Sequence, residues 1–483
     1  MMNNNSLKRK TVKGLAWSIT ELVSKQGIQL IIQVILARLL VPEHFGLIGM
    51  ITIFIAISNT LVNSGMDQAL IRESSPTKAD LSTVFYFNLF VSLLIYIILF
   101  LIAPYVSLFF NEPQLVNIIR VLMLIVIINA LGTIQKVILI RNVDFKTQTK
   151  ITMIAGVLSG FLAILFAVNG LGVWSLVIQI MTMQLTQTIL FYLNNRWLPS
   201  LTFNIDTFKA YFSFGYKLLI SSLIDTTYKN IYFVIIGVLY STNYLGYYTN
   251  ASKLRDISSQ SITQAIQKVT YPVLSSIKEE NTRLSNGYKQ VIKMSGYVIF
   301  PIMMGLAATA PNFIPLLLGE QWVPSVKYFQ LLCFAGMLYP IHSINLNILK
   351  VKGRSDLFLK LEIIKKVILT MLIICAVSLN TGIIGLISAA LLNSYIALFI
   401  NMYYSGKEVS YKFLDQIKDL APIFTISLLM SFLVYLLKNW IGIYFVDLIL
   451  QIVFGIFLYV VLSLIFRVTE FKELAIILKN FIK

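Results

Sequence analysis

Cysteine, histidine and charged residues are all scarce in this 483-residue chain, which has two cysteines, two histidines and 12% charged residues. So few cysteines, both in apolar runs, predict neither a disulfide framework nor a metal site. The patterns G-x-x-x-x-G-K-[ST], H-E-x-x-H and G-x-S-x-G do not occur, so the sequence offers no ATP-binding P-loop, zinc-protease helix or hydrolase elbow. A soluble domain has roughly a quarter charged residues, so this composition excludes one as well.

Long apolar runs are what the chain does have, since 57% of its residues are hydrophobic and its mean hydropathy is +0.80. A helix crosses a hydrocarbon core of about 30 Å with roughly 20 apolar residues. Val91–Ile102 and Leu448–Ile465 are almost entirely apolar, which favours helices over the alternating strands of a β-barrel. The sequence therefore predicts an all-α integral membrane protein of about fourteen transmembrane helices. The predicted helices are 13–37, 46–64, 81–103, 115–139, 150–168, 172–193, 214–239, 244–275, 290–309, 325–349, 357–379, 382–403, 420–438 and 443–466.

The net charge of +18 comes from 39 Lys and Arg against 21 Asp and Glu. Most of these cations fall in alternate loops, beginning with Lys8, Arg9 and Lys10, which is the pattern of the positive-inside rule. The pattern predicts that both termini are cytoplasmic, and it explains the charge without a nucleic-acid partner. The longest predicted outside loop, 310–324, has only about fifteen residues, which leaves no room for a catalytic domain. We therefore expect a transporter and not an enzyme.

The chain also repeats itself. Ile35–Ile48 and Ile235–Tyr248 both read as a helix end, a short hairpin and a new helix, with Gly46 matching Gly246. Six predicted helices separate the two copies, so both copies have the same orientation in the membrane. Such a parallel repeat is related by an axis along the membrane normal.

A second pair of repeated segments lies further along the chain, where Asn169–Val177 matches Leu379–Ile387 and Asp144 matches Asp356. Together the repeated segments predict two six-helix lobes related by a pseudo-twofold along the membrane normal, plus two C-terminal helices. The predicted divisions are an N-terminal lobe at 1–200, a C-terminal lobe at 201–410, and two additional helices with a cytoplasmic tail at 411–483.

Two predicted helices carry polar residues along one face. These residues are Ser18, Glu21, Lys25, Gln29 and Gln33 in the first helix, and Lys217, Ser221, Asp225, Tyr228, Lys229 and Tyr232 in the seventh. Each set spans an arc of about 120°. A charge at mid-bilayer costs about 2.5–3.5 kcal/mol on insertion scales, so these faces are expected to line a water-filled cavity. The alternative is that Glu21–Lys25 and Asp225–Lys229 are structural i,i+4 pairs.

The eighth predicted helix is the least apolar. Its Lys253 and Arg255, together with Lys25 and Lys229, are expected to bind an anionic head group, for which arginine is well suited. The alternative, which the sequence favours equally, is that Arg255 pairs with Asp256 or with another helix and only stabilises the lobe. Glu21, Asp225 and Asp256 are the candidates for charge balance or ion coupling, and Asn63 is a further polar residue of the cavity. His342 is expected to be a hydrogen-bonded structural residue rather than a proton carrier.

Several short motifs resemble those of a known family. They are Gly14-Leu15-Ala16-Trp17, Leu36–Gly46 (LARLLVPEHFG), Arg141–Lys146, Gly170–Val177 (GLGVWSLV), Trp197-Leu198-Pro199, Leu245–Tyr248, Gly319–Trp322 and Lys352-Gly353-Arg354. Their order and spacing resemble the polysaccharide transporters, the Wzx-type flippases of the multidrug/oligosaccharidyl-lipid/polysaccharide exporter superfamily. The resemblance covers residues 10 to about 405.

The resemblance implies a flippase for a polyprenyl-diphosphate-linked oligosaccharide of O-antigen, capsule or exopolysaccharide in the bacterial inner membrane. It further implies alternating access coupled to H⁺ or Na⁺, no bound cofactor, and a polysaccharide polymerase and a chain-length regulator as partners. Rival functions are a lipid-linked peptidoglycan precursor flippase and a multidrug/cation antiporter of the same superfamily. A polytopic glycan polymerase is a weaker rival, because it would need a large external loop.

Overall fold

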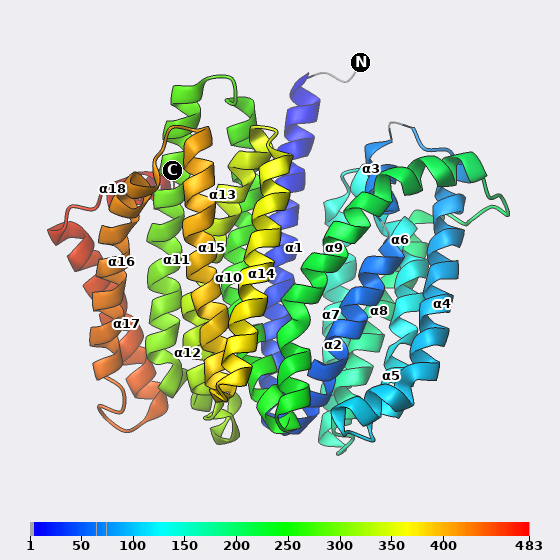
Figure 1. The fold of residues 1–483 in the computed structure, drawn as a ribbon, viewed down its shortest axis with the longest axis horizontal. Coiled ribbons are helices and arrows are strands. Elements are labelled where there is room, and N and C mark those ends of the chain that lie inside the picture. Colours follow the sequence, from blue (N-terminus) through cyan, green and yellow to red (C-terminus); the bar gives the residue numbers. More distant parts are fainter. Residues whose placement is uncertain (1–3, 64, 74, 483) are drawn as a thin grey trace. The chain divides into compact units, whose positions relative to one another are not determined.

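The computed structural model describes residues 4–63, 65–73 and 75–482, and every regular element within these ranges is helical (Figure 1). The α-helices are α1 (Asn4–Leu39), α2 (Pro42–Asn63), α3 (Met66–Arg72), α4 (Lys78–Phe110), α5 (Leu115–Leu122), α6 (Leu124–Arg141), α7 (Phe145–Val168), α8 (Val173–Asn195), α9 (Ile205–Leu239), α10 (Thr242–Ser276), α11 (Asn281–Leu318), α12 (Ser325–Gly336), α13 (Tyr339–Val351), α14 (Ser355–Ser378), α15 (Gly382–Glu408), α16 (Phe413–Leu436), α17 (Tyr444–Ile465) and α18 (Thr469–Ile482). A short 3₁₀ helix, η1 (Glu320–Trp322), precedes α12.

The helix boundaries repeat along the chain, as the repeated segments of the sequence predicted. Helices α1 and α9 end at Leu39 and Leu239, and α2 and α10 begin at Pro42 and Thr242. Helices α7 and α14 correspond in the same way at both ends, with a larger offset. One predicted match between the repeats is wrong, because the residue equivalent to Asp144 is Arg354 and not Asp356. Asp144 and Arg354 are the N-cap residues of α7 and α14, with φ,ψ of −90°, 64° and −84°, 59°.

Contacts divide the chain into two compact units, Met1–Thr249 and Asn250–Lys483, and the division falls inside α10. Helix α9 thus belongs to the first unit, where it packs along α2 and also contacts α3 and α4. These two units are defined by contacts between residues, whereas the predicted lobes were defined by the internal repeat. The predicted lobe boundaries at residues 200 and 410 therefore remain a prediction.

Within the first unit, the α1–α2 hairpin crosses the α9–α10 hairpin, and two glycines permit the crossing. A Cβ atom on Gly46 would collide with the backbone carbonyl oxygen of Thr242, and one on Gly246 would collide with that of Pro42. Because Pro42 and Thr242 are also repeat mates, the contact has a local twofold character. A backbone carbonyl cannot rotate aside as a side chain can. The matching glycines in the sequence therefore have a packing cause.

Eleven helical stretches in the described ranges are long and apolar enough to cross a bilayer, which confirms a multi-pass helical membrane fold. Two of these stretches each join a pair of helices, α5 with α6 and α12 with α13. Helices α9, α10 and α14 are more polar and are not among them, although the shortest has 24 residues. A 24-residue helix is about 36 Å long, so each could still span about 30 Å of hydrocarbon. The count of fourteen therefore remains a prediction.

The predicted loop at 310–324 is wrong over most of its length, because α11 continues to Leu318. The helix includes Pro301, Pro311 and Pro315. A proline removes the hydrogen bond to the carbonyl four residues earlier. For Pro311 that carbonyl belongs to Ala307, and Gln330 donates its side-chain Nε2 to this oxygen at 2.9 Å. Membrane helices tolerate proline when a neighbouring helix satisfies the freed carbonyl in this way.

The sequence also missed smaller features of the helices. It did not predict α3 or α18, and it treated two broken helices as continuous ones. The breaks lie at Met123, between α5 and α6, and at Met337–Leu338, between α12 and α13.

In the second unit the C-terminal helices α16, α17 and α18 all pack against α11. Lys289 of α11 pairs with Asp419 of α16 at 2.9 Å, and Lys293 pairs with Glu470 of α18 at 2.5 Å. Burial and the Asp419 carboxylate raise the pKa of Tyr411, so its hydroxyl stays protonated and donates to Asp419 Oδ2 at 2.6 Å. The additional helices are thus bound to α11 by polar contacts as well as by apolar packing.

Candidate functional site

Charged side chains from different helices of the first unit lie within electrostatic range of one another. Lys136 of α6 lies within electrostatic range of Lys25 of α1 and of Asp67 of α3. Both lysines are exposed, whereas Asp67 is half-buried. We call this group the Lys25–Lys136 cluster. Glu21 also lies within electrostatic range of Lys25, so two lysines and two carboxylates share this region. The two ammonium groups are exposed and can meet an anion.

Sequence reasoning identified Lys25 but missed Lys136, which lies in a mostly apolar predicted helix. A signal was nevertheless present, because Asn129, Thr133 and Lys136 share one face of α6 at helical spacing. What the sequence could not reveal was that α6 packs against α3 and brings Lys136 within electrostatic range of Lys25 on α1.

Glu21 does not form the expected ion pair with Lys25. Instead it accepts hydrogen bonds from Gln148 Nε2 at 3.1 Å and from Thr152 Oγ1 at 3.5 Å, both on α7. Within the described part of the chain no ion pair joins Glu21 to Lys25, although the two lie within electrostatic range. The structural-pair alternative therefore does not hold for these two residues. The ammonium group of Lys25 is available to interact with other groups.

The rest of the α1 stripe varies in exposure. Gln29 is exposed and Gln33 is half-buried, while the side chain of Ser18 lies outside the described residues. On α2, Asn63 is half-buried. These polar residues remain predicted contacts.

On α9 the second stripe contains an ion pair. Lys229 Nζ lies 2.6 Å from Asp225 Oδ2, with 71% and 43% of the two side chains exposed. Ser221 is exposed and Tyr228 half-buried on the same helix. The structural-pair alternative thus describes the observed geometry here, but the pair is open enough for Lys229 to meet a ligand as well.

Arg255 in the second unit is buried and surrounded by partners of its own unit. Its guanidinium lies 2.7 Å from Asp256 Oδ1, donates to Ser252 Oγ at 2.9 Å and stacks over the Tyr339 ring at 5.4 Å. These contacts join α10 to α13 and favour the stabilising alternative for Arg255. Lys253, two residues earlier, is exposed and remains a predicted contact for an anion.

Substitution of Arg255 with methionine is expected to lower the thermal stability of the purified protein. The change keeps most of the aliphatic bulk but leaves the Asp256 carboxylate without its partner. Asp256 is 35% exposed, so we expect a loss of about 1–3 kcal/mol rather than the full penalty of a buried pair. The matched control is Arg283→Met, whose exposed pair with Glu280 should contribute at most about 1 kcal/mol. Equal melting temperatures for the two variants would contradict the stabilising role.

His342 has two side-chain neighbours, as expected of a structural histidine. Its Nε2 lies 3.2 Å from Ser394 Oγ and its Nδ1 lies 3.2 Å from Asn401 Nδ2, both on α15. Because both ring nitrogens are engaged between α13 and α15, the side chain contributes to helix packing.

A chain of three amides in the first unit was not predicted. Asn129 of α6 donates Nδ2 to Asn59 Oδ1 at 2.9 Å, and Gln184 of α8 donates Nε2 to Asn129 Oδ1 at 3.2 Å. All three side chains are half-buried. The amide chain links α2, α6 and α8.

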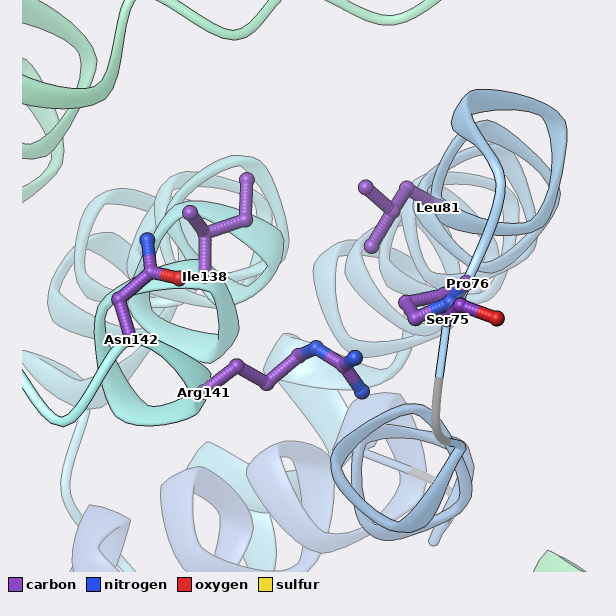
Figure 2. A pocket seen from close by; sticks show the side chains of 6 residues that line it. All are labelled: Ser75, Pro76, Leu81, Ile138, Arg141 and Asn142. Carbon is purple, nitrogen blue, oxygen red and sulfur yellow. The ribbon is translucent and has the colours of Figure 1, made fainter. Parts of the chain in front are cut away.

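A pocket of about 280 Å³ lies at the end of α6 in the first unit (Figure 2). It is lined by Ser75, Pro76, Leu81, Ile138, Arg141 and Asn142. Figure 2 shows the Arg141 side chain extending from α6 towards the loop that carries Ser75 and Pro76. Arg141 donates Nη1 to the carbonyl oxygens of Leu70 and, at 2.5 Å, Glu73. The arginine therefore connects the end of α3 to α6. None of the residues predicted for the site lines this pocket.

Comparison with known proteins gives one family. Residues 35–327 match the family described as "Polysaccharide biosynthesis protein". The teichuronic acid biosynthesis protein TuaB of Bacillus subtilis (strain 168) is 28% identical over 356 residues, which are 73% of each chain. The lipopolysaccharide biosynthesis protein WzxC of Escherichia coli (strain K12) is 25% identical over 394 residues, covering 80% of this chain and 78% of that one.

Solved structures show the same fold. The lipid II flippase MurJ in an inward closed conformation superposes with a TM-score of 0.76 and 17% identity, covering 93% of this chain and 98% of MurJ. A transporter of the MOP superfamily from Pyrococcus furiosus gives a TM-score of 0.57 and 16% identity, covering 82% of this chain and 96% of its own. At such identities the likeness concerns the fold alone.

Proposed function

The chain belongs to the polysaccharide biosynthesis protein family, and from that premise we propose that it is a flippase for a polyprenyl-diphosphate-linked oligosaccharide. The oligosaccharide is the repeat unit of an O-antigen, a capsule or an exopolysaccharide. The names of TuaB, a teichuronic acid biosynthesis protein, and of WzxC, a lipopolysaccharide biosynthesis protein, support this substrate class.

The Lys25–Lys136 cluster is the observation that carries the proposal. Exposed lysines on helices of a membrane protein are costly unless they meet water or an anionic ligand. A diphosphate is such a ligand, and its hydrogen bonds to ammonium groups are strengthened by charge. Lys229 and Lys253 are further proposed contacts within their own units, with Asp67 and Asp225 as charge balance. Arg255 and Asp256 hold α10 in place.

We further propose that the protein lies in the bacterial inner membrane with both termini in the cytoplasm, as the distribution of its basic residues predicts. In this orientation the two repeats form the two lobes of an alternating-access transporter driven by H⁺ or Na⁺. A polysaccharide polymerase and a chain-length regulator act on the exported repeat unit. The chain itself carries out no chemical step.

Reconstitution tests the proposal directly. The probe is the lipid-linked glycan extracted from cells that lack this transporter, incorporated into vesicles with the purified protein. We expect the glycan to become accessible to an impermeant lectin on the opposite leaflet much faster than in protein-free vesicles. If the protein does not accelerate this transfer, with or without an ion gradient, it is not a flippase for that lipid.

The likeness to MurJ favours one second candidate, a lipid-linked peptidoglycan precursor flippase. The two candidates differ in what the protein restores in cells. Rescue of a strain depleted of its peptidoglycan precursor flippase would favour the second candidate. Rescue of surface polysaccharide in a strain lacking its own exporter would favour the first.

A further inference from the structure

The geometry points to the amide chain Asn59–Asn129–Gln184 as a binding site for the sugar part of the substrate. This inference rests on the proposed function, and it adds a second subsite with a different chemistry. The Lys25–Lys136 cluster can recognise a diphosphate but offers little to discriminate between neutral sugars. The amide chain offers neutral donors and acceptors.

The two subsites share a helix face. Asn129 and Lys136 are seven residues apart on α6, which places them on the same face and about 10 Å apart along the axis. A ligand whose diphosphate meets Lys136 would therefore extend along α6 towards Asn129. An oligosaccharide attached directly to that diphosphate fits this order of contacts.

The amide chain also has unused hydrogen-bonding capacity at both ends. Asn129 uses its Nδ2 and Oδ1 inside the chain, as donor and acceptor. Among the described residues nothing pairs with Asn59 Nδ2 or with Gln184 Oε1, and neither atom is enclosed. The chain thus presents an NH₂ donor at one end and a carbonyl acceptor at the other. A sugar hydroxyl both donates and accepts hydrogen bonds, so it matches this pair of ends.

These amide atoms are not expected to face lipid. Within the first unit α2 contacts α4, α6, α8 and α9, so Asn59 lies on a helix with neighbours on several sides. Unpaired amide groups facing hydrocarbon would cost several kcal/mol each. Their accessible atoms are therefore expected to face water or a polar ligand. Linked hydrogen bonds also polarise one another, so the end groups of the amide chain form stronger hydrogen bonds with a ligand.

Binding measurements with two lipids test the inference. The first probe is the lipid-linked glycan extracted from cells that lack the transporter, and the second is undecaprenyl diphosphate without sugar. Asn59→Ala and Gln184→Ala should each weaken binding of the first lipid about three- to tenfold, the effect of one lost hydrogen bond, and leave the second unchanged. The matched control is Asn88→Ala, which removes a fully buried amide of the same unit and should change neither affinity.

Each other outcome overturns the inference in a distinguishable way. Equal weakening for both lipids would mean that the amides only support the packing of α2, α6 and α8. Unchanged affinity for both lipids would exclude contact with the glycan. If the wild-type protein binds the two lipids equally well, the sugar makes no contact here although the diphosphate site stands. If it binds neither, the proposed function fails together with this inference.

Discussion

Replacing Gly246 with alanine is expected to destabilise the protein severely, by about 3 kcal/mol or more, and to reduce the amount that folds in the membrane. The added methyl group would collide with the backbone carbonyl oxygen of Pro42. Backbone atoms on a helix end cannot move without displacing α2, so the crossing of the two hairpins must open. The melting temperature of the purified variant and its yield by size-exclusion chromatography measure the effect.

Two further variants make this prediction specific. Gly46→Ala should be about as damaging, because its Cβ would meet the Thr242 carbonyl in the reciprocal contact. Gly27→Ala is the control, since nothing lies within 4 Å of a Cβ at that position of α1. Helix propensity favours alanine over glycine by about 1 kcal/mol, so this variant should be as stable as the wild type or more so. A Gly246→Ala protein with the melting temperature of Gly27→Ala would exclude the packing argument.

The architecture was predictable because its signals are local in the sequence. The length of an apolar run fixes a membrane helix, and matching glycines such as Gly46 and Gly246 mark the same turn in each repeat. Hydropathy could not reveal that α11 passes through Pro311, since the compensating donor, Gln330, lies on α12. Element boundaries of this kind depend on a partner that is distant in sequence.

The candidate site was predictable only in part, for a related reason. A stripe of polar residues shows that a helix face is unusual, but it does not show what the face meets. Glu21 turned out to contact α7 rather than Lys25, and Arg255 is enclosed by partners of its own unit. Lys136 and Asn129 lie on one polar face of α6, but the sequence does not show which helices that face meets. Contacts between helices therefore decide which polar residues remain available to a ligand.

Removing both cations of the Lys25–Lys136 cluster is expected to abolish export of the lipid-linked glycan. Each ammonium group can donate a charge-assisted hydrogen bond to the diphosphate, which contributes about 1.5–3 kcal/mol. Loss of both should weaken binding of undecaprenyl diphosphate at least about 100-fold, since 1.4 kcal/mol corresponds to a factor of ten. The double variant Lys25→Ala, Lys136→Ala should fold normally, because both side chains are exposed and neither forms an ion pair within the described residues. Affinity for the sugar-free lipid and transfer of the glycan in vesicles measure the two effects.

The controls separate a contact from a general effect of charge. Lys209→Ala removes one exposed lysine from the same unit outside the cluster and should leave binding unchanged. Lys25→Arg and Lys136→Arg keep the charge and should retain most of the affinity, whereas Lys136→Glu should reduce it more than alanine does. A general electrostatic attraction would instead make the Lys209 and Lys136 alanine variants equally weak and equally sensitive to salt. The Asp67 carboxylate lies within electrostatic range of Lys136, so neutralising that residue with asparagine should strengthen diphosphate binding. A weaker Asp67→Asn variant would mean that the carboxylate positions Lys136 and does more than offset its charge.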